Sequence, residues 1–270
     1  MKAQKKIRLM ALDLDDTLLT TDKRFTERTR EVLQECMNRD IRVVTASGRF
    51  LESQLIFVKN LHLGIEHSPQ IGDGGGTIFT EEKLLWRLGK MTKAQVKAVL
   101  AQIRRYRLKA YIADGLNVYY ERQYPEMKHL YAAQTTVRRR YVYPVDDLSE
   151  IENPLRFIFY CKNRMEMAKV RQIHVSGMSV YHGGRTIMEI ASNEMNKFQA
   201  LNFLCRHYGL SMDEVAAIGD SENDLPMIRG VGLGMAVGNA ASILKSEADA
   251  VGPWSNDEDG AAKLIEKYVL

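Results

Sequence analysis

Residues 13–17 read Asp-Leu-Asp-Asp-Thr and place three carboxylates within four positions near the start of the chain. They follow a short apolar run, Leu9–Leu12, whose length and position predict a buried parallel strand. In doubly wound sheets, ligands bind beyond the carboxyl ends of the strands, so a site is expected here. Acids this close repel one another unless a cation or solvent relieves them. Taken alone, the cluster could equally be a solvated acidic turn.

A second acidic cluster follows another predicted strand. Val215–Ile218 leads into residues 219–224, which read Gly-Asp-Ser-Glu-Asn-Asp. If both strands end at the same edge of one sheet, the two sets of carboxylates converge. Oxygen-only ligands in this number favour a hard cation, and we predict Mg²⁺. The candidate metal ligands are Asp13, Asp15, Asp220 and Asp224.

Two further segments contain groups that could hold a phosphate. Ser47-Gly48-Arg49 follows the β-branched run Ile41–Thr45, and a small hydroxyl beside free loop N–H groups suits phosphate oxygens. A plain turn is the alternative. Lys197 stands at the start of a predicted helix, where its charge opposes the helix dipole. A nearby acidic partner would explain that position, and a solvated lysine is the alternative.

The elements that carry these segments alternate between strand and helix. Thr26 can cap a helix over residues 27–39, the strand at 41–45 follows, and residues 50–61 are again helical in pattern. This β-α-β-α order with short connections predicts an α/β fold with a doubly wound, Rossmann-like parallel sheet. The glycine-rich stretch 71–77 is either a flexible turn or a backbone that approaches a ligand closely.

Between residues 84 and 182 the pattern changes. A helix over 92–106 precedes two strands around Asp114-Gly115, which is a hairpin signal, and a helix-and-strand pattern then appears again. From Ile187 the alternating pattern resumes. We therefore predict a core domain formed by residues 1–83 and 183–270, with an inserted α+β cap domain over 84–182.

Composition narrows the class of protein. The 270 residues carry a net charge of only +4, and no basic stripe interleaves with aromatic residues, so we expect no nucleic-acid partner. No apolar run approaches the roughly 18–20 residues of a membrane helix, and the N-terminus does not match a signal peptide. The three cysteines form no CxxC pair. We expect a cytoplasmic enzyme without a membrane partner, as a monomer or weak homodimer.

The order of the motifs resembles the haloacid dehalogenase (HAD) superfamily of phosphatases. Asp-x-Asp-x-Thr at 13–17, hydroxyl-Gly-Arg at 47–49, Lys197 and Gly-Asp-x-x-Asn-Asp at 219–224 each fall after the expected strand or at a helix start. Two more segments look like recurring elements of the Cof-type subfamily (type IIB): Met235–Ala240 and Asn256–Gly260.

The resemblance implies that the inserted domain is a mobile cap over the substrate. It also implies a mechanism. Asp13 would attack phosphorus and form an aspartyl-phosphate, and Asp15 would protonate the leaving group and then activate water. Mg²⁺ would be held by Asp13, the main-chain carbonyl of Asp15, and Asp220, with Asp224 acting through water or a hydrogen bond. The groups that would hold the phosphoryl oxygens belong to Leu14, Ser47, Gly48, Lys197 and Asn223.

The sequence departs from the family's pattern at three positions. Asp16 stands where Gly is frequent, Ser47 stands where Thr is commoner, and Asp73 stands where a substrate-near Asn is often found. Arg49 could bind an anion or brace its loop, and Arg138–Arg140 could be a solvated edge or a contact to a second phosphate.

These observations favour a Mg²⁺-dependent phosphatase acting on a small phosphorylated metabolite, such as a sugar phosphate, a phosphorylated cofactor or a nucleotide. A phosphotransferase or phosphomutase would carry the same motifs. A catalytically silent metabolite-binding protein is a third possibility, although such a protein would be expected to lose Asp13 or Asp15 first.

Overall fold

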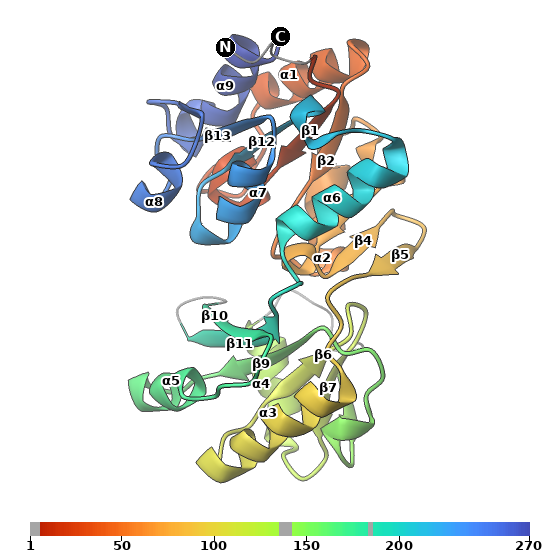
Figure 1. The fold of residues 1–270 in the computed structure, drawn as a ribbon, viewed down its shortest axis with the longest axis vertical. Helices are drawn as coiled ribbons and strands as arrows, with labels where there is room; N and C mark the ends of the chain where they lie inside the picture. The colour runs from red at the N-terminus through yellow and green to blue at the C-terminus, as the bar shows by residue number, and fades with distance from the viewer. Residues whose placement is uncertain (1–5, 135–141, 183–185) are drawn as a thin grey trace. The chain divides into compact units, whose positions relative to one another are not determined.

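The computed structural model describes residues 6–134, 142–182 and 186–270 (Figure 1). These residues form two compact units. The first comprises the described residues within 1–86 and 196–270, and the second comprises those within the intervening range 87–195. Within the described ranges, no helix combines the length and the apolar character needed to cross a membrane.

A five-stranded parallel sheet forms the centre of the first unit, in the order β14-β13-β12-β1-β2 (Figure 1). β1 lies beside β2 and β12 and is buried along its whole length, which explains its uninterrupted apolar sequence. The predicted parallel α/β core is therefore confirmed. The strands are β1 (Leu9–Leu12), β2 (Arg42–Thr45), β12 (Val215–Gly219), β13 (Leu233–Ala236) and β14 (Ala250–Val251).

Helices pack against this sheet, and polar side chains set where two of them begin. Thr26 accepts a hydrogen bond from the N–H of Thr29, and Asn196 accepts one from Gln199, so both residues cap their helices. α1 packs against α9, and α6 packs against α7 (Figure 1). The helices of this unit are α1 (Glu27–Asn38), α2 (Leu51–Lys59), α6 (Lys197–Tyr208), α7 (Leu225–Gly230), α8 (Ser242–Lys245) and α9 (Gly260–Tyr268).

A small three-stranded sheet, β3-β4-β5, follows α2 and contains the glycine-rich stretch. Its strands are β3 (Gln70–Gly72), β4 (Thr77–Phe79) and β5 (Leu84–Arg87). Gly75 has a φ of +104°, and a Cβ atom there would lie 2.2 Å from the carbonyl oxygen of Asn196. The glycine is thus needed for close packing against the start of α6, a reason that neither sequence-based interpretation of this stretch included.

The second unit contains a six-stranded sheet in the order β10-β11-β9-β6-β7-β8. Side chains from α3 and α5 pack on one face of it and form a hydrophobic cluster with alternate residues of β9, Phe157 and Phe159. The elements are α3 (Lys93–Tyr106), α4 (Glu126–Gln134), α5 (Arg164–Arg171), β6 (Tyr111–Ala113), β7 (Val118–Glu121), β8 (Val142–Val145), β9 (Arg156–Tyr160), β10 (Met178–His182) and β11 (Ile187–Ser192).

The position of β11 differs from the sequence-based expectation. The predicted core resumed at residue 183, whereas β11 pairs with β9 and β10 and belongs to the sheet of the second unit. Its pairing is determined by partners distant in the sequence, which a local pattern does not reveal. The run Arg138–Arg140 lies outside the described residues.

The glycine loop supplies a stability prediction with an adjacent control. Gly74 also has a positive φ, +66°, but a Cβ there would meet no atom within 4 Å. We expect Gly74→Ala to lower the free energy of unfolding by about 1 kcal/mol, through backbone strain alone. Gly75→Ala adds a steric clash and should cost about 3 kcal/mol or more. Urea denaturation of both variants tests this, and equal losses would contradict the packing role of Gly75.

Candidate active site

The two acidic clusters of the sequence meet at one edge of the core sheet. β1 and β12 are parallel neighbours with Leu12 opposite Ile218, so the residues that follow both strands emerge side by side. The N–H of Asp13 donates to the carbonyl oxygen of Ile218 at 3.0 Å. This adjacency brings Asp13 close to Asp220 and Asp224.

A buried lysine connects the clusters. Nζ of Lys197 donates to Oδ1 of Asp13 at 2.5 Å and to Oδ1 of Asp224 at 2.6 Å. Lys197 and Asp224 are 1% and 0% exposed, and Asp13 is 5% exposed. Lys197 is the first residue of α6. Asn196 caps this helix, and the main chain at Asn196 packs closely against Gly75, so the point from which the Lys197 side chain extends is fixed. The structure thus favours the acidic partner over a solvated lysine.

Three carboxylates surround this one ammonium group. Oxygen atoms of Asp13, Asp220 and Asp224 lie within 4.8 Å of one another. Oδ1 of Asp220 accepts a hydrogen bond from the hydroxyl of Thr17 at 3.0 Å. Both oxygens of Asp224 are used, because Oδ1 binds Lys197 while Oδ2 accepts from the N–H groups of Asp220 and Ser221.

The protonation equilibria reflect the excess of negative charge. Burial, together with the charges of Asp224 and Asp220, raises the pKa of Asp13 well above its ordinary value, although Lys197 opposes the shift. Burial and the neighbouring Asp224 raise the pKa of Asp220 to about 6. Burial disfavours the charged form of Lys197, but attraction to the two carboxylates outweighs it and raises the pKa of the ammonium group.

The group has the donors that a hard cation requires. Within the described part of the chain, Oδ2 of Asp13 and Oδ2 of Asp220 accept no hydrogen bond, whereas both carboxylate oxygens of Asp224 do. Two free carboxylate oxygens and an uncompensated negative charge fit a divalent cation that binds oxygen. Asp224 is instead placed to orient its own loop and Lys197.

Asp15 lies in different surroundings from these three acids. Its carboxylate binds Arg49 through both oxygens, each at 2.6 Å, and Nζ of Lys23 lies 3.0 Å from Oδ1. Burial would raise the pKa of Asp15, but the bonds to Arg49 and Lys23 outweigh it and lower the pKa. The side chain of Asp15 is therefore held as an ionised partner of Arg49 in this structure.

Arg49 is itself held in place from two sides. Its NH1 donates to the hydroxyl of Ser53 at 3.0 Å, and its guanidinium lies 4.2 Å from the centre of the Phe57 ring. Both contacts come from α2, the helix that begins two residues later. Of the two roles left open by the sequence, bracing describes this structure, with Asp15 as the anion that Arg49 binds.

The loop that holds Ser47 and Gly48 rests on the neighbouring small sheet. The N–H of Ser47 donates to the carbonyl oxygen of Ile71 at 3.0 Å, and the N–H of Gly74 donates to Ser47 at 2.9 Å. Asp73 is fully buried, and its N–H donates to the carbonyl oxygen of Arg49 at 2.9 Å. Asp73 therefore lies beneath the loop, a position that supports the loop rather than one open to a substrate.

The remaining predicted phosphate ligands lie on the turns around these groups. No described residue accepts a hydrogen bond from the N–H of Leu14 or of Gly48, so both donors remain available. Asn223 is exposed on the turn after β12, where its side-chain oxygen accepts from Ser221 at 2.7 Å. Asp16 has a φ of +59°, a conformation in which Gly or Asp is tolerated more readily than other residues.

Sequence reasoning did not identify two contacts of this site. Thr17 belongs to a recognised motif, but its bond to Asp220 depends on the adjacency of β1 and β12. Lys23 carries no motif signal, because it reaches Asp15 only through the turn that follows β1. A lysine within ten residues of an acidic cluster is too common a pattern to have singled it out.

Comparison with known proteins gives a family match over nearly the whole chain. Residues 10–265 match the model of the haloacid dehalogenase-like hydrolases. The chain is 27% identical to the 5-amino-6-(5-phospho-D-ribitylamino)uracil phosphatase YcsE of Bacillus subtilis, over 98% of this chain and 96% of that protein. It is 24% identical to a phosphoglycolate phosphatase of Methanobrevibacter smithii, over 97% of this chain and 98% of that one.

A solved structure supports the fold. A haloacid dehalogenase-like hydrolase from Bacteroides thetaiotaomicron superimposes with a TM-score of 0.77 at 27% identity, covering 97% of this chain and 99% of that one.

The buried lysine gives a pH-dependent stability prediction. Lys197→Met leaves two buried carboxylates without their cation, which should lower the free energy of unfolding by about 3–5 kcal/mol near pH 8. A carboxylic acid whose pKa is higher in the folded protein than in the unfolded chain takes up its proton first in the folded protein as the pH falls. The loss of stability caused by Lys197→Met should therefore shrink as the pH falls toward 5. Urea denaturation in EDTA at both pH values measures it.

The exposed Lys83 provides the matched control for this measurement. Lys83→Met should change stability by no more than about 0.5 kcal/mol at either pH. If Lys197→Met were as stable as the unaltered protein at pH 8, the buried ion pairs would not have the importance assigned to them.

Proposed function

Because this chain belongs to the haloacid dehalogenase-like hydrolases, we propose that it is a Cof-type member of subclass IIB and that it cleaves small phosphate monoesters with Asp13 as the nucleophile. It is a phosphatase of that family. The observation that carries the proposal is the environment of Asp13, a buried carboxylate with one oxygen on Lys197 and the other free.

The first chemical step forms a covalent intermediate. Oδ2 of Asp13 attacks phosphorus in line, the bond from phosphorus to the ester oxygen breaks, and an aspartyl-phosphate results. Asp15 gives a proton to the departing alkoxide. In the second step, Asp15 takes a proton from water as that water attacks phosphorus, and Asp13 and inorganic phosphate are released.

The role of Asp15 requires it to change partners. In the structure Arg49 and Lys23 keep it ionised, and an ionised carboxylate has no proton to give. A phosphate ester that arrives beside Arg49 competes for the guanidinium and adds negative charge next to Asp15. Both effects raise the pKa of Asp15 and favour the protonated form needed for the first step.

The other polar groups hold charge as it moves. Lys197 stays protonated and balances Asp13 and the transferring phosphoryl group. The N–H groups of Leu14 and Gly48, the hydroxyl of Ser47 and the side chain of Asn223 are the proposed donors to the phosphoryl oxygens.

We assign Mg²⁺ to the carboxylate group at the strand ends. The Asp13 carboxylate, Oδ2 of Asp220 and the main-chain oxygen of Asp15 would hold it while Oδ2 of Asp13 stays available to attack phosphorus, and Asp224 would act through water or a hydrogen bond. When bound, the ion neutralises the crowded carboxylates and draws charge from the phosphoryl oxygens.

The substrate class is a small phosphorylated metabolite. The two named relatives act on a phosphorylated ribityl compound and on phosphoglycolate, which share a phosphate monoester on a short polar carbon chain. We therefore place sugar phosphates and phosphorylated cofactors first, and nucleotides after them. A phosphotransferase or phosphomutase would share the chemistry of Asp13 and would differ only in the acceptor of the phosphoryl group.

Phosphate release tests the proposal directly. Across a panel of phosphate monoesters, we expect the protein to release inorganic phosphate with Mg²⁺ and to lose this activity in EDTA. Asp13→Asn should reduce the rate by at least about 10³-fold, because no nucleophile replaces it. Asp22→Asn, a matched change of an exposed aspartate nearby, should leave the rate unchanged. Metal-independent release, or full activity of Asp13→Asn, would refute the proposal.

The proton donor can be isolated by varying the leaving group. kcat/KM includes only the steps up to phosphoryl transfer, so it reports on protonation of the leaving alkoxide. We expect Asp15→Asn to lower kcat/KM by about 10²–10⁴-fold for an alkyl phosphate. The loss should be much smaller for p-nitrophenyl phosphate, whose leaving group departs without a proton. Equal losses for both esters would assign Asp15 a structural role instead.

A further inference from the structure

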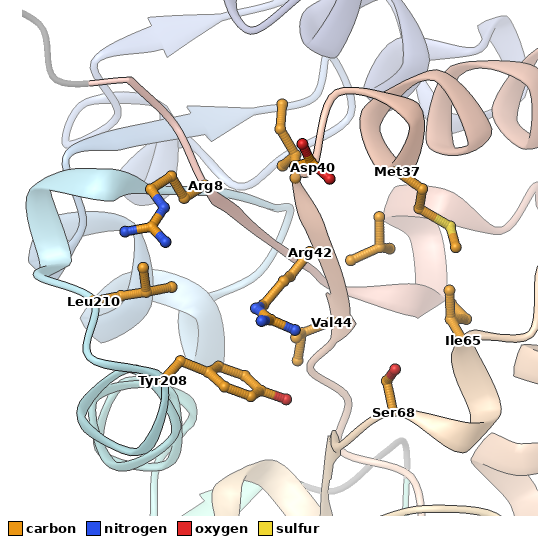
Figure 2. Close-up of a pocket in the computed structure, with 11 residues that line it drawn as sticks. Arg8, Met37, Asp40, Arg42, Val44, Ile65, Ser68, Tyr208 and Leu210 are labelled. Carbon is orange, nitrogen blue, oxygen red and sulfur yellow. The ribbon is translucent and has the colours of Figure 1, made fainter.

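A second concave site lies at the other end of the core sheet from the carboxylate group. The cavity has a volume of about 370 Å³ and is built entirely from residues of the first unit (Figure 2). Arg8 directly precedes β1 and Arg42 begins β2, so the cavity opens at the amino ends of these strands. Asp13 follows the opposite end of β1, roughly 16 Å away along the strand.

The cavity lies beside the outer edge of β2, which is the last strand of the sheet. Arg42 and Ala46 direct their N–H groups to the β1 side, to the carbonyl oxygens of Arg8 and Leu12. Because backbone groups alternate along a strand, Val43 directs its N–H and C=O to the opposite side, where the cavity lies. The wall therefore offers a backbone donor as well as side chains.

Arg42 supplies the charge of this cavity. Its guanidinium lies 4.4 Å from the centre of the Tyr208 ring, and Figure 2 shows the side chain extending into the cavity toward Tyr208. Within the described chain it has no carboxylate partner, whereas Arg8 is paired with Glu214 at 3.3 Å. A guanidinium stacked on a ring keeps its edge N–H groups free, and these match a carboxylate or phosphate.

Apolar side chains line the cavity on both sides of Arg42 (Figure 2). Val44, Ile65 and Leu210 line the cavity and are each less than 9% exposed, and Met37 stands near Ile65 in Figure 2. Asp40 is an exposed residue of the lining and lies apart from the Arg42 guanidinium in Figure 2; it opposes an anion near itself, which favours binding of the acidic group at the Arg42 side. The cavity thus combines one unpaired cation with an apolar wall.

We propose that this cavity binds a small organic anion, whose carboxylate or phosphate meets Arg42 while its apolar body lies against Val44 and Ile65. The site is separate from the proposed phosphatase centre and does not depend on it. A strongly hydrated inorganic anion would leave the apolar wall uncovered, so the apolar body is part of the recognition.

Titration calorimetry with simple probes tests the site. The probes are 3-phenylpropionate and benzylphosphonate as the acids, and 3-phenylpropan-1-ol as the neutral analogue. We expect both acids to bind at low ionic strength and the alcohol to bind at least tenfold more weakly. Arg42→Gln removes the cation and should weaken both acids at least tenfold. Ser68→Trp, from the exposed rim, should fill the cavity and do the same.

The controls separate this site from the phosphatase centre and from a general charge effect. Arg229→Gln alters an arginine paired with Glu247 elsewhere on the unit and should leave binding unchanged. Phosphate release by Arg42→Gln should stay within twofold of the unaltered protein, which also shows that the variant is folded. Undiminished binding of both acids to Arg42→Gln, equal binding of the alcohol, or no binding of either acid at millimolar concentration would overturn the proposal.

Discussion

The buried ammonium group of Lys197 is the interaction on which the rest of this site depends. Asp13 and Asp224 come from different strand ends and would repel each other in a region that excludes water. Lys197, bonded to both, allows the two loops to close around it. The same contacts leave one oxygen of Asp13 free, which is the oxygen that the proposed mechanism uses for attack.

Holding Lys197 there places demands on distant parts of the chain. The Lys197 side chain must extend from the first turn of α6. Asn196 caps that helix and so sets where this turn begins. Gly75 allows the small sheet to approach Asn196, the residue that caps α6, and the hydrogen bond from Gly74 to Ser47 then ties this sheet to the loop that holds Ser47 and Gly48. One glycine loop therefore positions both a cation and a hydroxyl that the proposed chemistry uses.

The sequence was sufficient for the parts of the structure that local pattern and strand adjacency determine. β1 is uninterruptedly apolar, α1 begins at a good cap, and the acids of 13–17 and 219–224 follow neighbouring strands, so their convergence was predictable. The pairing of β11 with β9, and that of Asp15 with Arg49, depend on contacts between segments far apart in the chain. No local pattern distinguishes these pairings from their alternatives.

The central claim is that Asp13 carries the phosphoryl group during turnover. The most direct measurement quenches the enzyme with acid in the presence of substrate and Mg²⁺, reduces the acyl phosphate with borohydride, and locates the resulting homoserine by peptide mass spectrometry. The account predicts a substrate-dependent conversion at position 13. Conversion at another residue, or none during a burst of released alcohol, would contradict it.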